Sequence, residues 1–240
     1  MNILSARGLT KNFNGLSAVD NVCLDVPHGQ VRALIGPNGA GKTTLVGMLS
    51  GRVTPSSGSI TFDGREVTSW PSHKRIAAGV GYTFQITSIF PNLSVWENVA
   101  LAARRKLTAA KAVEQAVRSA LDEVGLGSRQ AESAGDLSYG HQRLLEIAMG
   151  LAQAPKLLIL DEPTQGLAGG EVADFLNLIA KLRGGTTVFL IEHNMDVVMQ
   201  VADFVTVLDS GRVIFEGTPK EVKASETVQV AYLGGGDAAA

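Results

Sequence analysis

Apolar residues in the first third of the chain fall into short runs, a pattern that predicts strands. Residues 19–26 alternate loosely between apolar and polar, residues 30–35 form a mostly apolar run, and residues 59–64 run into an Asp-Gly turn. The mostly apolar run is typical of a strand that is buried on both faces. Residues 44–50, shortly after that run, are compatible with a helix.

From Ser94 onwards the spacing of the apolar residues changes to that of helices. Ser94 and Glu97 occupy N-cap and capping-box positions, which predicts that a helix begins there. Residues 109–124 carry a continuous apolar stripe at helical spacing. The residues of this stripe are Val113, Ala116, Val117, Ala120, Leu121 and Val124. A further helix is predicted over residues 139–152.

Strands and helices alternate in the last third of the chain. The predicted strands are residues 156–161, 186–191 and 204–208, and the predicted helices between them are residues 171–182 and 194–201. This alternation predicts an α/β fold with a mostly parallel sheet and right-handed crossovers.

The helical block of residues 88–152 interrupts this alternation. We therefore interpret it as an inserted subdomain, and we expect the core to consist of about residues 1–87 and 153–233. Residues 1–233 would then form a single domain. Residues 234–240, which contain only Gly, Asp and Ala, are predicted to be a flexible tail.

Composition narrows the classes of protein to which the chain can belong. Its 240 residues are enough for a full core, and a formal net charge of -2 gives no overall attraction to nucleic acid or anionic lipid. Cys23 is the only cysteine, which excludes an internal disulfide and a cysteine-based metal site and favours a reducing compartment. No secretory signal and no apolar window of about 18 residues occur, so we expect that the chain does not cross a membrane.

One glycine-rich motif predicts a phosphate site. Residues 36–43 fit the pattern G-x-x-x-x-G-K-[ST] and lie between a predicted strand and a predicted helix, so backbone N–H groups and the helix dipole can converge on an anion. Lys42 would add an ammonium group, and Thr43 a hydroxyl for Mg²⁺. The residues assigned to this site are Gly36, Pro37, Asn38, Gly39, Ala40, Gly41, Lys42, Thr43 and Thr44. The alternative is a glycine-rich turn with a solvated lysine.

Two acids, Asp161 and Glu162, follow four apolar residues at the end of a predicted strand. The carboxyl ends of strands are where α/β sheets hold their ligands. Asp161 is suited to fixing Mg²⁺ through its water shell, and Glu162 to orienting or deprotonating an attacking water. The alternative for each acid is a helix cap or a solvated strand end.

Ser138 and Gly140 open the predicted helix of residues 139–152. Ser138 can cap this helix, and Gly140 leaves a backbone N–H uncovered. The pair is therefore predicted to form a second anion site. An ordinary capped helix remains the alternative.

Five motifs together resemble those of ATP-binding cassette (ABC) ATPases in order and spacing. They are residues 36–44, 83–85, 137–142, 160–163 and 191–193. Within that superfamily the chain is similar to the ATPase subunits of branched-chain amino acid importers. The matching segments are residues 81–90, 137–140, 191–195 and 231–234. The ATPases of urea importers and lipopolysaccharide exporters resemble each other along the same stretches.

The resemblance implies a P-loop NTPase fold of the ABC type. This fold has a mostly parallel core sheet, an N-terminal antiparallel β subdomain and an inserted α-helical subdomain. It also implies that two cassettes stack head to tail, each ATP lying between the phosphate loop of one chain and Ser138, Gly140 and Gln142 of the other. Hydrolysis would then be the step that releases the two chains.

Three further residues match functional positions of the family. Phe13 would stack on adenine, Gln85 would contact Mg²⁺ and the attacking water and hinge the helical subdomain, and His193 would contact the γ-phosphate. The implied catalytic residues are Glu162, His193 and Gln85, and the implied metal residues are Thr43, Gln85 and Asp161. The alternatives are a core phenylalanine, an exposed turn glutamine and a structural histidine.

Two positions depart from the common pattern of the family. Tyr139 replaces the first glycine of the usual signature, as in the branched-chain subgroup. Ala168 stands where relatives often carry Asp or Asn. Because alanine cannot make a polar side-chain contact across the dimer, coupling between the two ATP sites is expected to be weaker or to run through the backbone.

The implied partners are an integral membrane permease, a second ABC ATPase subunit and, indirectly, a substrate-binding protein. The implied location is the cytoplasmic face of a bacterial-type inner membrane, as a peripheral subunit. The permease interface would be lined by four apolar residues, or these residues would belong to the core of the subdomain. They are Ile86, Ile89, Phe90 and Leu93. We expect no nucleic-acid partner, because the chain has no second cassette, coiled-coil insertion or basic patch. A P-loop kinase or GTPase is disfavoured because no Asn-Lys-x-Asp motif occurs.

Overall fold

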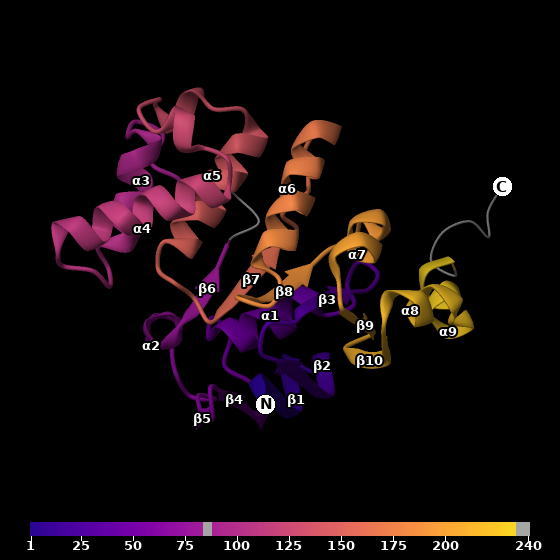
Figure 1. Ribbon diagram of the computed structural model, residues 1–240. Coiled ribbons are helices and arrows are strands. Elements are labelled where there is room, and N and C mark those ends of the chain that lie inside the picture. The colour runs from indigo at the N-terminus through magenta and orange to yellow at the C-terminus, as the bar shows by residue number, and fades with distance from the viewer. Residues whose placement is uncertain (84–87, 234–240) are drawn as a thin grey trace.

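The structure is a computed structural model that describes residues 1–83 and 88–233, and its strands form two sheets (Figure 1). Within these residues one sheet has six strands, in the order β10-β9-β3-β8-β7-β6. Its strands are β3 (Val31–Ile35), β6 (Val80–Tyr82), β7 (Leu157–Asp161), β8 (Thr187–Ile191), β9 (Phe204–Asp209) and β10 (Arg212–Gly217). Neighbouring strands are parallel except for β9 and β10, so the predicted mostly parallel core sheet is confirmed.

The second sheet is antiparallel, with the order β2-β1-β4-β5. Its strands are β1 (Asn2–Phe13), β2 (Leu16–Pro27), β4 (Ser57–Phe62) and β5 (Arg65–Glu66). The apolar pattern of the sequence did not predict β1. The register of β1 against β2 shifts at several points, one of them between Ala6 and Leu9, so its buried residues do not alternate as in a regular strand.

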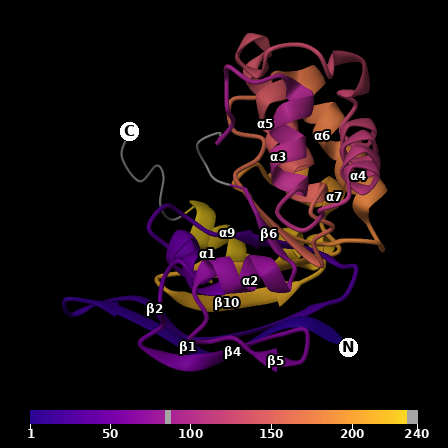
Figure 2. The same cartoon turned by 90° about the vertical axis from the view of Figure 1, so that its left-hand side faces the viewer.

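The helices lie on both sides of the six-stranded sheet. They are α1 (Lys42–Ser50), α2 (Ser72–Ala78), α3 (Val95–Ala103), α4 (Ala110–Glu123), α5 (Tyr139–Leu151), α6 (Gly169–Leu182), α7 (Met195–Val201), α8 (Pro219–Ala224) and α9 (Glu226–Leu233), with short 3-10 helices at Gly127–Arg129 and Ala134–Asp136. Figure 2 shows α3, α4 and α5 at one end of the molecule and the antiparallel sheet at the other. Among the described helices none is long and apolar enough to cross a membrane.

The helices predicted after residue 94 are confirmed, and their ends differ from the prediction by about two residues at most. The predicted capping box of α3 is present: the N–H of Glu97 donates to Ser94 Oγ at 3.2 Å, and the N–H of Ser94 donates to Glu97 Oε2 at 2.8 Å. On the exposed face of α4, Arg118 pairs with Glu114 at 3.0 Å. Local signals were sufficient here because both contacts join residues one turn apart.

Alternate side chains of the central strand β7 point to opposite faces of the six-stranded sheet and pack in two different hydrophobic cores. Leu158 and Leu160 of β7 lie in a hydrophobic core with residues of α3 to α6. Leu157 and Ile159 of the same strand lie in a second core, with residues of α1 and the antiparallel sheet. Burial on both faces explains why β3, β7 and β8 consist mostly of apolar residues.

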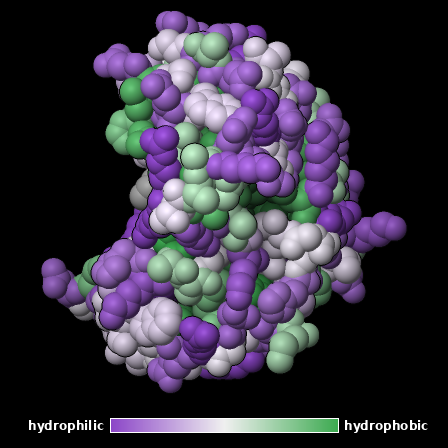
Figure 3. All heavy atoms as spheres, turned by 60° about the vertical axis from the view of Figure 1, so that its left-hand side comes forward, coloured by the Kyte–Doolittle hydropathy of each residue, from purple (hydrophilic) through white to green (hydrophobic). Residues whose placement is uncertain are grey.

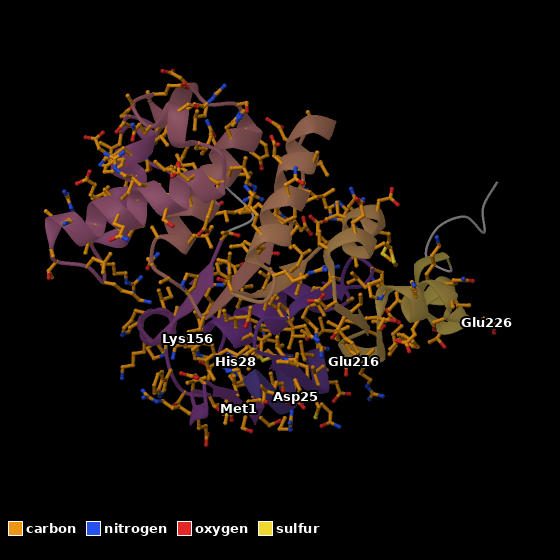
Figure 4. The ribbon with its side chains drawn as sticks, in the orientation of Figure 1. Met1, Asp25, His28, Lys156, Glu216 and Glu226 are labelled. Atoms are coloured by element: carbon orange, nitrogen blue, oxygen red, sulfur yellow. The ribbon has the colours of Figure 1, made fainter. Side chains whose placement is uncertain are left out.

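The two sheets are joined by a buried arginine of β3, Arg32. Its guanidinium donates to the backbone carbonyl of Asp25 in β2 at 2.6 Å and to Glu216 Oε1 in β10 at 2.6 Å. In Figure 4, Asp25 and Glu216 lie near each other where β2 and β10 meet. Burial lowers the pKa of Arg32, and the carboxylate of Glu216 acts in the opposite direction. One side chain therefore bonds to strands of both sheets.

Candidate functional site

The glycine-rich loop connects the end of β3 to the start of α1, as the motif requires. A Cβ on Gly36 would lie 2.0 Å from the carbonyl oxygen of Leu208, and a Cβ on Gly41 would lie 2.3 Å from the carbonyl oxygen of Ala18. Gly41 also has a φ of 98°, which side chains rarely tolerate. Both glycines are therefore required by the close approach of other strands to the loop.

Lys42 lies folded against this loop. Its Nζ donates to the carbonyl oxygens of Gly36 at 2.7 Å and Pro37 at 3.0 Å. Burial lowers the pKa of Lys42, and the nearby carboxylates of Glu162 and Asp161 act in the opposite direction. The ammonium group is thus held half-buried at the loop, with two acids close enough to influence its charge.

A cavity of about 490 Å³ lies in front of the loop. Of the predicted phosphate residues, it is lined by Asn38, Gly39, Ala40, Gly41, Lys42, Thr43 and Thr44, together with Glu162. Sequence reasoning missed the other lining residues, Leu16, Ser17, Ala18, Ser210 and Gly211. Ser210 and Gly211 form a recognisable turn signal, but nothing local to that turn indicates that it lies beside the loop.

Asp161 ends β7 and is buried, with only 6% of its surface exposed. Its Oδ2 accepts a hydrogen bond from Tyr82 Oη of the neighbouring strand β6 at 2.7 Å. Burial, followed by the hydrogen bond to Asp161, raises the pKa of Tyr82, so the phenol stays protonated and remains a donor. Tyr82 orients Asp161, a role that the sequence analysis did not assign.

Glu162 and His193 are brought together at the ends of β7 and β8. Glu162 adopts a φ of 48°, which is uncommon for a residue with a side chain, and its carboxylate lines the cavity. His193 Nδ1 lies 3.9 Å from Glu162 Oε1. Of the predicted catalytic residues, these two are therefore neighbours, whereas Gln85 lies outside the described residues.

The loops that carry this pair are held by Glu192, which is fully buried. Its Oε2 accepts hydrogen bonds from the backbone N–H groups of His193 at 3.1 Å and Asn194 at 3.2 Å. Its Oε1 accepts from the N–H of Thr164 at 3.1 Å and from Thr164 Oγ1 at 2.5 Å. The sequence analysis included Glu192 in the motif of residues 191–193 but assigned it no role, although a charged residue directly after a buried strand is a usable signal.

Ser138, Gly140 and Gln142 do not line the cavity, as far as the described residues show. Ser138 caps α5 by accepting a hydrogen bond from the N–H of His141 at 3.3 Å, as predicted. The space above Gly140, however, is not open. The carboxylate of Glu171 fills it: a Cβ on Gly140 would lie 2.1 Å from Glu171 Cδ.

Phe13 lies at the end of β1 and is 46% exposed, which excludes the alternative of a core phenylalanine. It pairs across the hairpin with Leu16, which is 70% exposed and lines the cavity. Lys11 Nζ lies 5.0 Å from the centroid of its ring. An exposed aromatic ring next to the phosphate cavity is suited to stacking on a flat base.

Comparisons with known proteins agree with this geometry. The family described as "ABC transporter" matches residues 19–165, and the family described as "Branched-chain amino acid ATP-binding cassette transporter" matches residues 212–238. The chain is 41% identical to the branched-chain amino acid transport ATP-binding protein BraF of Pseudomonas aeruginosa, over 97% of this chain and 98% of that protein. It is 37% identical to LivG of Salmonella typhimurium, with the same coverage.

Two further similarities bear on the family. The lipopolysaccharide export ATP-binding protein LptB of Haemophilus influenzae is 36% identical to this chain, with 98% of each covered. A crystal structure of an ATP-binding cassette of an ABC transporter, in its ADP conformation, superimposes with a TM-score of 0.89 at 28% identity, over 98% of this chain and 99% of that one. The chain therefore belongs to the ABC transporter family, as one of its ATPases.

Proposed function

We propose that this ATPase powers the import of branched-chain or other hydrophobic amino acids through a separate membrane permease. The observation that carries the proposal is the match of residues 212–238 to a family described by that substrate class. Its support is the similarity to BraF and LivG along nearly the whole chain. The identity to LptB, 36%, is lower than the identities to BraF and to LivG of Salmonella typhimurium. Lipopolysaccharide export is therefore the second candidate function.

In the proposed reaction the phosphates of ATP lie against the glycine-rich loop and Lys42, and the adenine stacks on Phe13. Glu162 orients and deprotonates the water that attacks the γ-phosphate. His193, 3.9 Å from Glu162, contacts the same phosphate and positions it. The exposure of His193, whose side chain is 54% accessible, leaves its ring free to reach a ligand.

Asp161 and Thr43 fit Mg²⁺, because carboxylate and hydroxyl oxygens are the ligands that this ion prefers. One carboxylate oxygen of Asp161 is already oriented by Tyr82. When bound, Mg²⁺ would neutralise charge on the β- and γ-phosphates. Gln85 is proposed as a further Mg²⁺ residue on resemblance alone.

The proposed assembly is a head-to-tail pair of cassettes on the cytoplasmic face of the membrane. Ser138, Gly140 and Gln142 of one chain would complete the ATP site of the other. The permease would dock on the helical subdomain, where Phe90 is 53% and Leu101 is 44% exposed. Figure 3 shows one mostly hydrophilic face of the molecule with hydrophobic side chains gathered across its middle.

Isolation of the tagged chain from native membranes tests the proposal. We expect it to copurify with permease subunits, and we expect its ATP hydrolysis in that complex to rise when an amino-acid-loaded binding protein is added. Stimulation by lipopolysaccharide instead would favour the second candidate. Copurification of stoichiometric nucleic acid without any permease would contradict both.

A further inference from the structure

The carboxylate of Glu171, in the first turn of α6, lies on the N-terminus of α5. Ser138 Oγ donates a hydrogen bond to Glu171 Oε1 at 2.8 Å, and the backbone N–H of Ala168 donates to Glu171 Oε2 at 3.0 Å. The carboxylate also fills the space directly above Gly140. Glu171 therefore bridges the start of α6 and the start of α5, two helices that begin about 30 residues apart in the chain.

This position is one where the protein favours a negative charge. The backbone N–H of Ala168, followed by the hydroxyl of Ser138, lowers the pKa of Glu171, and His141 and the backbone N–H of Gly140 add to this effect. His141 Nδ1 lies 2.6 Å from Ser138 Oγ. Because the single hydroxyl proton of Ser138 points to Glu171, this arrangement assigns a proton to His141 Nδ1. The start of α5 is thus a binding site for an anion, and an internal carboxylate occupies it.

The next step rests on the proposed function, in which Ser138 and Gly140 receive the γ-phosphate of ATP held by a second chain. A carboxylate and a phosphate cannot share one small anion site, because they repel each other and compete for the same donors. We propose that Glu171 occupies the γ-phosphate position of the free subunit and that ATP carried by the partner has to displace it. Glu171 is then a further residue of the composite ATP site, which raises the ATP concentration needed to join two chains.

The size of the effect follows from the fraction of chains whose anion site is open. The apparent affinity for a ligand falls in proportion to that fraction. A hydrogen bond of ordinary net strength, as expected for this exposed contact, would keep the site closed in most chains. We therefore expect that removing the charge of Glu171 lowers the ATP concentration for half-maximal dimer formation about three- to tenfold.

The experiment compares Glu171→Gln with its parent, both carrying Glu162→Gln so that bound ATP is not consumed. The measurement is the fraction of dimer in sedimentation or gel filtration as ATP is titrated with Mg²⁺. Glutamine keeps an oxygen for the N–H of Ala168, so α6 stays capped and the melting temperature should not change. The matched control is Asp174→Asn, which removes one exposed negative charge one turn further along the same helix.

The expected result is a lower ATP midpoint for Glu171→Gln and an unchanged midpoint for Asp174→Asn. An unchanged or higher midpoint for Glu171→Gln would overturn the inference while leaving the composite site intact. If the parent binds ATP in calorimetry but never dimerises, the composite site itself fails, and the inference falls with it.

Discussion

At the scale of single residues, the cavity at the glycine-rich loop is lined by one cation, Lys42, and one acid, Glu162, and Asp161 precedes that acid at the end of β7. Lys42 is held by two backbone carbonyls of its own loop, so its ammonium group is in place before a phosphate arrives. Asp161 is fixed by a hydrogen bond from Tyr82, and the backbone carbonyl of Glu162 is held by a hydrogen bond from Arg143. Such pre-orientation lowers the reorganisation that binding and catalysis require.

Glu162→Gln should abolish turnover and leave ATP binding intact. The amide keeps the shape of the side chain but cannot take a proton from water, so hydrolysis should fall by about two orders of magnitude or more. Phosphate release measures the loss, and calorimetry measures binding. The control is Glu114→Gln, which makes the same change on the exposed face of α4. Wild-type turnover in Glu162→Gln would contradict the role of this residue.

Lys42→Ala should weaken ATP binding by about tenfold or more, because it removes the only side-chain cation among the residues that line the described cavity. The measurement is ATP titration in a calorimeter. Lys106→Ala, a change to a lysine whose Nζ bonds to the carbonyl of Gln153, is the control and should leave binding unchanged. Equal affinity for Lys42→Ala and wild type would refute the assignment of the loop.

At the scale of elements, α5 and β7 are connected by Arg143. This arginine of α5 is 2% exposed, pairs with Glu146 at 3.2 Å and donates to the backbone carbonyl of Glu162 at 3.2 Å. The helix whose start is the proposed anion site is therefore bonded directly to the backbone of Glu162. A movement of α5 would therefore shift the backbone of Glu162 through the hydrogen bond from Arg143.

Arg143→Met should destabilise the protein by about 3 kcal/mol or more, because Glu146 loses its guanidinium partner in a buried place. Urea unfolding measures the change. The double variant Arg143→Met with Glu146→Leu should regain part of the lost stability, since it removes both charges. A double variant that is less stable than the single one would show that the pair is not the source of the loss.

At the scale of the whole molecule, the two sheets are held together by Arg32 as well as by the apolar core between them. Arg32 bonds to β2 and β10, and its guanidinium also lies 4.5 Å from the ring centroid of Phe204. Ala18 of β2 and Gly211, which directly precedes β10, both lie at the loop, and the backbone N–H of Asp20 in β2 donates to the carbonyl of Gly211 at 2.8 Å. The position of the antiparallel sheet therefore shapes the cavity.

Arg32→Met should lower the free energy of unfolding by about 2 kcal/mol, through the loss of buried charged hydrogen bonds. The control is Arg7→Met: Arg7 pairs with the carboxylate of Asp25, but the two side chains are 53% and 43% exposed, so the loss should be about 1 kcal/mol or less. Denaturant unfolding of both variants measures the difference. If both variants lost the same free energy of unfolding, the burial of Arg32 would add nothing to the contact between the sheets.

Comparison of predicted and observed elements shows where sequence patterns suffice. The strands β3, β7 and β8 and the helices α3 to α7 were predicted because their spacing is local and regular, whereas α8 and α9 were not predicted. The strand β1 was missed because bulges break its alternation, and β6 is too short, at three residues, to carry a pattern. The loop, the acids and the N-cap at Ser138 were found because each lies next to the element that presents it.

The sequence by itself determined the chemistry: a phosphate loop between a strand and a helix, two acids at a strand end, and a capped helix start. Each of these depends on residues a few positions apart, whose geometry the local backbone sets. Only the tertiary structure decided what lies against them, namely Tyr82 on Asp161, the hairpin residues beside the loop, and Glu171 above Gly140. Those contacts join distant segments, and packing in the folded chain alone brings them together.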